Sequence, residues 1–399
     1  MRQAVVGETP RPKYVVWEIT LACDLACGHC GSRAGKARAK ELSTAECLDV
    51  VRQLAAMGTE EITLIGGEAY LRNDWTTIAR AVVDAGMRCG MTTAGRGFDR
   101  EQARAARAAG LSAISVSLDG LRDAHDRQRM AGSFERAREA MRHVRDAGLG
   151  LNANSQLNRL SAPDLEGVLD LLIAEGARGW QVQLTVPMGR AAENDAWLLQ
   201  PWELLELYPR LAALAVRGRE AGVAFWPANN IGYYGPYESL LRNRGVEGAR
   251  VWHGCPAGTF ALGLEADGSV KGCPSLPTAS YVGGNALARS LREIWDETRE
   301  LRFTRDRTRD ELWGFCASCY YADECRAGCT WTAHTFFGKP GNNPYCHHRA
   351  LEHAARGERE RLVRVEAPPG VPFDHGRFEI VVEAEGAGEA SARRLTVLC

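Results

Sequence analysis

The stretch ITLACDLACGHCGSRAG, residues 19–35, places Cys23, Cys27 and Cys30 within eight residues, directly after an apolar run. A zinc site usually closes with four ligands, commonly as two separated pairs, and no fourth cysteine lies near this stretch. Three thiolates suit a [4Fe–4S] cluster in which one iron keeps an open coordination position. Because an open iron can chelate a substrate or a cofactor, the spacing predicts a reactive metal site.

The bulk composition excludes several classes of protein. The chain has 399 residues, enough for two or three domains, with 45% hydrophobic and 25% charged residues. A net charge of −1 gives no electrostatic reason to expect nucleic acid or an anionic membrane as partner. No apolar run approaches eighteen residues, and the first residues lack the apolar segment of a secretory signal. We therefore expect a cytoplasmic protein.

The thirteen cysteines indicate metal binding. Disulfides are rare in a reducing compartment, so metal ligation or catalysis is the better interpretation. Cys47 and Cys89 lie in helix-like and strand-like apolar patterns and are expected to be small buried hydrophobes, whereas nothing decides the role of Cys399. The other ten fall into three groups: 23, 27 and 30; 255 and 273; and 316, 319, 325, 329 and 346.

The first half of the chain alternates short apolar runs with amphipathic segments. Six such units predict a parallel sheet with covering helices, and six suit a partial barrel better than a complete eight-fold one. In either architecture, ligands gather at the carboxyl ends of the strands. The expected strands are 13–20, 61–67, 88–95, 113–120, 150–156 and 180–186, and the expected helices are 44–58, 74–85, 100–109, 133–147 and 162–175.

The rest of the chain has a different character. A helix over 201–221 precedes an aromatic-rich stretch, 225–241, and a turn at Asp267-Gly268 predicts a β-hairpin over 260–273. The Cys-rich region beyond it cannot bury much core, so metal should supply its stability. A strand pair is expected at 378–384 and 393–399. The expected divisions are an N-terminal arm (1–12), a partial barrel (13–200), a helical and aromatic bridge (201–250), a Cys-rich domain (251–350) and a tail (351–399).

Further polar residues follow successive strands in the predicted barrel. Gly66-Gly67-Glu68 follows the second strand, Ser117 ends the fourth, and Arg129 comes shortly after it. Together with the C-x3-C-x2-C spacing, this order resembles the radical S-adenosylmethionine (SAM) enzymes. The resemblance implies that Cys23, Cys27 and Cys30 hold a [4Fe–4S] cluster whose open iron binds the amino and carboxylate groups of SAM. An electron from the cluster would cleave a C–S bond and yield a 5′-deoxyadenosyl radical, which abstracts hydrogen from the substrate.

The same resemblance implies a role for each companion residue. Gly66, Gly67 and Glu68 would meet the SAM amino group. Ser117 and Arg129 would hold its carboxylate or ribose, and arginine suits a carboxylate because its fork donates two parallel hydrogen bonds. His29, just before the third cysteine, matches the position that packs on adenine. One departure is the sequence TTAG at 92–95, where relatives often carry Thr-Asn-Gly.

The C-terminal cysteines resemble the SPASM domain, named after the maturases of subtilosin, pyrroloquinoline quinone, anaerobic sulfatases and mycofactocin. Both resemblances together cover about residues 13–350. This one implies two auxiliary iron–sulfur clusters, expected to be [4Fe–4S], and so three clusters in the chain. Auxiliary cluster I would take three thiolates and auxiliary cluster II four, so our hypothesis is that cluster I has an open iron, or takes a non-Cys or remote ligand. His253 lies nearby, with a packed or surface histidine as the alternative interpretation. The implied ligands are Cys255, Cys273 and Cys329 for cluster I, and Cys316, Cys319, Cys325 and Cys346 for cluster II.

The family resemblance indicates a substrate class. We expect an enzyme that modifies a ribosomally made precursor peptide by installing a carbon–carbon, carbon–oxygen or thioether crosslink. The alternatives are dehydrogenation of a Ser or Cys in a target protein, a small-molecule alcohol or sugar dehydrogenase or epimerase, and a non-catalytic cluster carrier, which would not need the SAM-binding residues. A flavodoxin or ferredoxin is the expected electron donor. Recognition of the peptide would come from a separate protein or from the barrel itself, whose channel residues 225–237 could line.

Overall fold

The computed structural model of the chain describes residues 9–242, 251–384 and 393–395. Most of the expected N-terminal arm, the last residues of the expected bridge, the end of the second tail strand and Cys399 lie outside the described residues. In the part of the chain that the structure describes, no helix has the length and apolarity needed to cross a bilayer.

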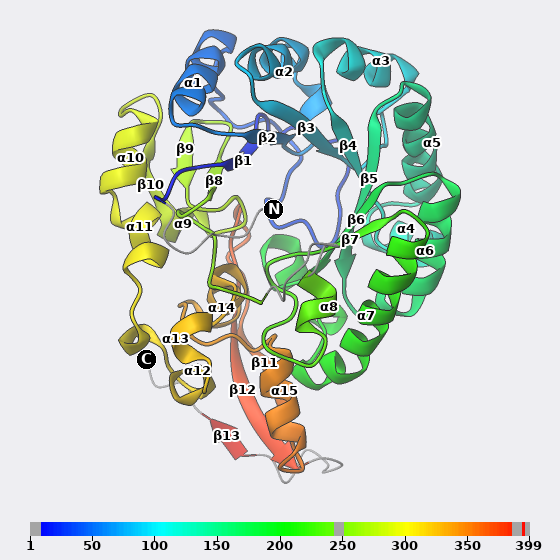
Figure 1. The fold of residues 1–399 in the computed structure, drawn as a ribbon. Helices are drawn as coiled ribbons and strands as arrows, with labels where there is room; N and C mark the ends of the chain where they lie inside the picture. The colour runs from blue at the N-terminus through cyan, green and yellow to red at the C-terminus, as the bar shows by residue number, and fades with distance from the viewer. Residues whose placement is uncertain (1–8, 243–250, 385–392, 396–399) are drawn as a thin grey trace.

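The six predicted strands all form, and each lies parallel to the next in chain order. Figure 1 shows the helices of this region in an arc around the outside of the curved sheet. The strands are β1 (Tyr14–Glu18), β2 (Glu61–Ile65), β3 (Arg88–Thr93), β4 (Ala113–Ser117), β5 (Gly150–Leu157) and β6 (Gly179–Leu184). The covering helices are α1 (Thr44–Ala56), α2 (Trp75–Asp84), α3 (Arg100–Ala109), α5 (Ser133–Asp146), α6 (Leu165–Ala174) and α7 (Leu204–Glu220).

Local sequence explains where these elements start and stop. Ser43 begins α1 with a capping box that it shares with Glu46, and Asp99 caps α3. Apolar residues alternate along the strands, so that Val15 and Trp17 of β1 are fully buried in the main core. The sequence missed α4 (Arg122–Gln128), a two-turn helix between β4 and α5.

Two further parallel strands flank the expected six. β7 (Ala224–Pro227) pairs with β6, and β8 (Ala261–Leu264) pairs with β1. β8 also forms the predicted hairpin with β9 (Ser269–Lys271), and β10 (Val282–Asn285) completes a ten-stranded sheet. β7 lies at one end of the sheet, whereas β8 lies between β9 and β1, and β7 and β8 are not paired with each other. The barrel is therefore open between them, as expected for a partial barrel.

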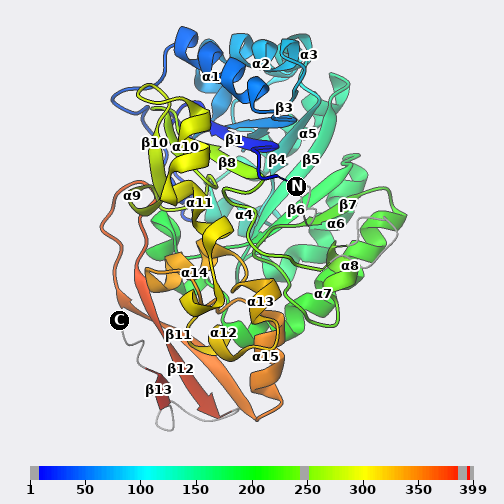
Figure 2. The ribbon, with the colours of Figure 1, turned by 60° about the vertical axis from the view of Figure 1, so that its left-hand side comes forward.

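Residues 315–354, at the end of the Cys-rich region, lie against the open side of the barrel, where Figures 1 and 2 both show them below β8. The helices of the Cys-rich region are short, as expected for a segment with little apolar core of its own. They are α9 (Thr278–Tyr281), α10 (Leu291–Glu297), α11 (Arg299–Asp306), α12 (Phe315–Ser318), α13 (Ala322–Cys325), α14 (Thr330–Phe337) and α15 (His347–Ala354). The short helix α8 (Glu238–Arg242) belongs to the bridge that precedes them.

The tail forms a three-stranded antiparallel sheet of β11 (Glu358–Glu366), β12 (Arg377–Ala384) and β13 (Arg393–Leu395). The predicted pairing of β12 with β13 is present, but the sequence missed β11. The connection between β11 and β12 returns to the first cysteine loop, where Phe373 N–H donates to the carbonyl of Gly31 at 3.1 Å. The tail is therefore attached to the barrel as well as to the Cys-rich region.

Candidate functional site

The first cysteine loop is anchored by backbone hydrogen bonds at the carboxyl end of β1 and β2. Cys23 N–H donates to the carbonyl of Gly35 at 2.9 Å and closes the loop on itself. Gly67 N–H donates to Thr20, at 2.9 Å, and Glu68 N–H donates to Ala22, at 2.8 Å, so the chain after β2 continues to pair with the chain entering the loop. The thiol of Cys23 is therefore held by backbone on both sides.

The two predicted glycines are required by this close approach. A Cβ atom on Gly66 would lie 2.3 Å from the carbonyl oxygen of Thr20. A Cβ on Gly67 would lie 2.3 Å from the oxygen of Ala22 and 2.5 Å from Cβ of Cys23. No real side chain tolerates such distances, so the Gly-Gly pair exists to let β2 reach the cysteine loop.

The three thiols of the loop lie close together in a mostly apolar setting. The pKa of Cys23 is raised to about 12, mainly by burial and also by the nearby Glu68, Cys27 and Cys30, while the Leu25 N–H opposes the shift. Burial also raises the pKa of Cys27. Leu25 N–H donates to the Cys23 sulfur at 3.4 Å, a contact of the kind that tunes iron–sulfur sites. Thiols that are costly to ionise alone fit a site in which bound iron displaces the protons.

Glu68 is buried and held in place from β3. Its carboxylate accepts a hydrogen bond from the Ala94 N–H at 2.7 Å and another from the Thr93 hydroxyl. Burial raises the pKa of Glu68 to about 7, while those two hydrogen bonds oppose the shift. Thr93 and the backbone of Ala94 therefore fix the orientation of Glu68, and the departure at 92–95 does not affect this contact, because Ala94 contributes only its N–H.

Asp119 organises the remaining predicted residues. It is 1% exposed, and its Oδ2 atom accepts from Arg129 Nε at 2.6 Å and lies 3.1 Å from His29 Nε2. Burial alone would raise the pKa of Asp119, but Arg129 and His29 outweigh it and hold that pKa well below its usual range. Arg129 also points Nη1 at the Cys27 sulfur, 3.8 Å away. Ser117 ends β4 two residues before Asp119 and is buried.

Besides Asp119, two residues of this site were missed from sequence. Arg190 donates from Nε to the carbonyl of Cys27 at 2.6 Å and from Nη2 to that of Ala34. Asn194 donates to the carbonyl of Gly28 at 2.9 Å. Both follow β6 in short turns, and no spacing or motif marks them. They hold the outer side of the cysteine loop, which β1 and β2 cannot reach.

The seven C-terminal cysteines separate into the two expected sets. Burial raises the pKa of Cys329 to about 12, and its interacting thiols are Cys255 and Cys273. Burial likewise raises the pKa of Cys325, whose interacting thiols come from the second set. That second set lines one small cavity and consists of Cys316, Cys319, Cys325 and Cys346.

Thiolates are the ligand type that holds iron–sulfur clusters. Within the described residues, no three His, Cys, Asp or Glu side chains surround one metal-ion position. A [4Fe–4S] cube spreads its ligands over separate irons, whereas zinc gathers four around one point. The only other described cysteines, Cys47 and Cys89, are buried in the barrel core as predicted, and neither joins these sets.

Backbone N–H groups point at most of these sulfurs, as they do at iron–sulfur clusters. The buried guanidinium of Arg349 adds a fixed positive charge near Cys316 and Cys346, and Glu360 of β11 holds it with two hydrogen bonds of 2.6 and 2.7 Å. The pairs of N–H donor and sulfur are Ser275 with Cys273, Tyr321 with Cys319, Gly328 with Cys325, Thr332 with Cys329, Arg349 with Cys346 and Asn343 with Cys316.

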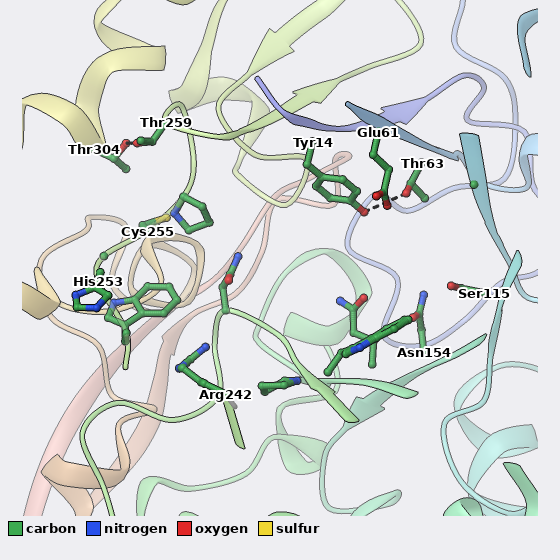
Figure 3. Close-up of a pocket in the computed structure, with 18 of the residues that line it drawn as sticks. Tyr14, Glu61, Thr63, Ser115, Asn154, Arg242, His253, Cys255, Thr259 and Thr304 are labelled. Atoms are coloured by element: carbon green, nitrogen blue, oxygen red, sulfur yellow. Dashed lines mark hydrogen bonds between the residues drawn. The ribbon is translucent and has the colours of Figure 1, made fainter. Parts of the chain in front are cut away.

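A cavity of about 560 Å³ occupies the interior of the barrel and extends to the Cys-rich region. The barrel strands line it with hydroxyl and amide side chains, among them Thr63, Ser115, Asn154 and Gln181, rather than with a packed apolar core. Figure 3 shows Cys255 on the opposite side from Thr63, Ser115 and Asn154. The cavity therefore joins the barrel to the first auxiliary set. Of the predicted channel residues 225–237, Trp226, Pro227 and Asn229 line it.

Comparisons with known proteins agree with this architecture. The family model of the radical SAM superfamily matches residues 17–155, and that of the SPASM iron–sulfur cluster-binding domain matches residues 255–320. An AdoMet-dependent heme synthase of Methanosarcina barkeri is 29% identical over 357 residues, which cover 86% of this chain and 99% of that protein.

Other relatives carry peptide-related names. The mycofactocin maturase of Mycolicibacterium smegmatis is 29% identical over 84% of this chain and 82% of its own length. A PqqA peptide cyclase of Ruegeria pomeroyi is 29% identical over 87% of this chain and 92% of its own. Among solved structures, Streptococcus suis SuiB bound to its precursor peptide SuiA superposes with a TM-score of 0.67 at 16% identity, covering 85% of this chain and 76% of SuiB, which shows a shared fold.

Proposed function

Since the chain is a radical SAM enzyme with a C-terminal SPASM domain, we propose that it abstracts a hydrogen atom from a ribosomally made precursor peptide and installs an oxidative crosslink there. The observation that carries the proposal is the cavity of about 560 Å³, whose wall offers amide and hydroxyl groups along several barrel strands. Such a wall can pair with the N–H and C=O groups of a peptide backbone, which an apolar pocket would leave unsatisfied.

The residues at the carboxyl ends of the strands would prepare SAM for the reaction. Cys23, Cys27 and Cys30 would hold a [4Fe–4S] cluster, and reduced cluster with bound SAM supplies the 5′-deoxyadenosyl radical. Glu68, fixed by β3, would accept hydrogen bonds from the SAM amino group. Arg129 keeps its guanidinium oriented through Asp119 and would present its remaining N–H groups to the SAM carboxylate.

His29 would pack against the adenine of SAM in the same site. Its Nε2 atom is tied to Asp119, and its Nδ1 atom is buried with no hydrogen-bond partner among the described residues. An imidazole held this way has one fixed ring orientation, which suits packing on a flat adenine ring. Ser117, at the end of β4, would bind the ribose or the carboxylate.

The C-terminal cysteines would hold two auxiliary clusters. Such a cluster would take up the second electron that an oxidative crosslink releases, and the second hydrogen would leave as a proton. Among the described residues, cluster I would have only three thiolates, since Cys47 and Cys89 are too deep in the barrel core to complete it. We infer that its remaining iron is open or takes a ligand other than cysteine. His253 lines the same cavity as Cys255 and is the nearest candidate along the chain. A flavodoxin or ferredoxin would deliver the first electron, and the cavity or a separate protein would recognise the peptide.

A second candidate function follows from the relatives named heme synthases. They match most of this chain, and arginines also line the cavity, which suits the carboxylates of a tetrapyrrole. Dehydrogenation of a Ser or Cys in a target protein, or oxidation of a small alcohol or sugar, would use the same SAM-binding residues.

One experiment separates these functions. The reconstituted enzyme is incubated anaerobically with SAM, a reductant and the peptide encoded beside its gene, and the products are read by mass spectrometry. A peptide lighter by two hydrogens, formed together with 5′-deoxyadenosine, supports the proposal. If SAM is cleaved only with iron coproporphyrin III or with a small alcohol, the peptide proposal is wrong. Replacement of Cys23, Cys27 and Cys30 by Ala should abolish SAM cleavage, whereas Cys89→Ala should preserve it.

A further inference from the structure

One arginine on the cavity wall is buried and, among the described residues, forms no ion pair with a carboxylate. Arg307 follows α11, is 4% exposed and lines the cavity. Its Nη1 atom donates to the Thr330 hydroxyl at 3.1 Å, and its guanidinium lies 5.4 Å from the centre of the Phe303 ring. Its Nε and Nη2 atoms are buried and have no hydrogen-bond partner among the described residues. A buried charge with two unmade hydrogen bonds is costly unless a ligand completes it.

The two nitrogen atoms define which ligand fits. Nε and Nη2 form one edge of the guanidinium, and their N–H bonds are parallel, which matches the two oxygens of a carboxylate. The same structure contains this contact elsewhere, because Arg349 uses its own Nε and Nη2 atoms to hold Glu360. In Arg307 the corresponding edge is buried and contacts no protein carboxylate among the described residues, and the residue itself lines the cavity.

The other charges on the cavity wall favour an anion. Arg305 donates to the carbonyls of Gly258 and Trp295 and, within the described chain, forms no ion pair. The lining acid, Glu61, is already paired with Arg88. The lining arginines therefore exceed the free carboxylates, and a negatively charged group entering the cavity would be attracted to this side.

Arg307 also lies near the first auxiliary set. Arg307 and Cys255 line the same cavity, and both act on the hydroxyl of Tyr281, whose pKa burial raises, Arg307 lowers and Cys255 raises. Figure 3 shows Cys255 and Thr304 together on one wall, across from the barrel residues Ser115 and Asn154. A group held by Arg307 would place the rest of the substrate between that wall and the barrel strands.

We propose that Arg307, assisted by Arg305, binds a carboxylate of the substrate and fixes the substrate between Cys255 and the barrel. This inference rests on the proposed function for the identity of the cavity as the substrate site. The carboxylate could be an acidic side chain or the C-terminus of the peptide, or a propionate of a tetrapyrrole. All of these groups are carboxylates that Arg307 would bind in the same way, and the binding experiment determines which of them it binds.

The test is a set of binding measurements on the full-length, cluster-reconstituted enzyme with SAM and no reductant, so that no turnover occurs. Calorimetry gives the dissociation constants of two probe series. The first series consists of the peptide encoded beside the gene, variants in which one Asp or Glu at a time is changed to its amide, and a version with an amidated C-terminus. The second is iron coproporphyrin III and its tetramethyl ester. Each probe is measured with the wild type, with Arg307→Gln and Arg307→Lys, and with Arg302→Gln, an exposed arginine on the neighbouring helix α11 that pairs with Asp306.

We expect that loss of one carboxylate weakens binding to the wild type by about 10- to 100-fold and has no further effect in Arg307→Gln. Arg307→Lys keeps the charge but cannot donate two parallel hydrogen bonds, so it should weaken binding by at least roughly 5-fold, while Arg302→Gln should match the wild type. Equal affinity for acids, amides and esters would overturn the proposal, as would unchanged binding in Arg307→Lys with its iron content intact.

The outcomes also separate this proposal from the proposed function. If iron coproporphyrin III shows the dependence on Arg307 and no peptide binds, the carboxylate site stands and the peptide substrate is wrong. If the peptide is oxidised but none of its carboxylates depends on Arg307, the peptide function stands and the carboxylate site is wrong.

Discussion

Arg33 and Asp374, 341 positions apart in the chain, form a two-pronged ion pair, with Nε to Oδ1 at 2.9 Å and Nη2 to Oδ2 at 3.2 Å. Arg33 lies three residues after Cys30, and Asp374 belongs to the connection between β11 and β12. The carbonyl of Asp374 also accepts from Gly189 N–H at 2.8 Å. The tail thus holds the loop that carries the predicted SAM cluster, and Asp374 is the residue that makes the contact.

Asp374→Ala should therefore destabilise the enzyme and loosen its first cluster. Removing one partner of a buried pair costs roughly 3 kcal/mol, at the lower end of the usual range because Glu193 still contacts Arg33. Urea unfolding measures the loss, and iron content after dilution into chelator measures the effect on the cluster. The control is Asp306→Ala, which breaks the exposed pair with Arg302 and should cost less than about 1 kcal/mol. Equal effects of the two substitutions would contradict the anchoring role.

Gly67→Ala should abolish SAM cleavage without unfolding the barrel. The added methyl group would collide with the carbonyl of Ala22 and with Cys23, and displacement of the cysteine loop by about 1 Å should lower 5′-deoxyadenosine formation on the order of 100-fold. Gly35→Ala is the matched control, because a Cβ there meets nothing within 4 Å. The assignment of the loop fails if both variants cleave SAM at the wild-type rate.

Counting iron tests the auxiliary clusters. We expect about three clusters' worth of iron in the reconstituted wild type, and Mössbauer spectra should show one auxiliary cluster with a distinct iron site. Added imidazole should perturb that cluster alone. Replacing Cys273 by Ala should eliminate it, whereas Cys47→Ala should leave the iron content unchanged. A cluster I with four cysteine ligands would refute the hypothesis of an open iron.

Acid should weaken the packing of the Cys-rich region through His334. Burial, together with His375, lowers the pKa of His334 to about 4, so the folded protein keeps this imidazole neutral. The unfolded chain binds the proton more readily, and stability is therefore lost as the pH falls from about 6.5 toward 4. The expected loss between pH 7.5 and 5.5 is about 1.4 kcal/mol from this group. Anaerobic urea titrations at both pH values measure it.

The control for the acid effect is His334→Gln, which can still accept a hydrogen bond from Tyr281 but cannot be protonated. Its unfolding free energy should change less with pH than that of the wild type, by about the same 1.4 kcal/mol. Parallel pH profiles for the two proteins would show that His334 does not contribute.

The sequence was most informative where one short segment determines the structure. The strands β1 to β6 follow from local apolar patterns, and the family resemblance carried by the glycine pair and the cysteine spacings implied the grouping of the ligands. By contrast, β7 has four residues and includes Pro227, so no strand was predicted there. It forms because Ala224 N–H and the chain after it complete hydrogen bonds offered by the edge of β6, as in the bond from Ala224 to the carbonyl of Arg178.

Long-range contacts explain the other misses. β11 reads as a charged segment because its buried acid, Glu360, is satisfied by Arg349 and His353 of a different element. Asp119 was not among the predicted site residues, and the fold brings His29 and Arg129 to it. Arg190 binds backbone carbonyls, which carry no sequence signal. In each case the partners lie in other elements or loops, and neither periodicity nor motif spacing indicates the contact.

The pairing of β1 with β8 has a consequence for how the protein is made. A ribosome that adds about 5–20 residues per second completes β1 roughly 12–50 s before β8 exists to cover it. Throughout that interval the first strand of the nascent barrel presents an unsatisfied edge, which is a template for pairing with another chain. A strand of the later Cys-rich domain thus covers the edge of β1, and production of intact enzyme depends on keeping that edge unpaired until β8 emerges.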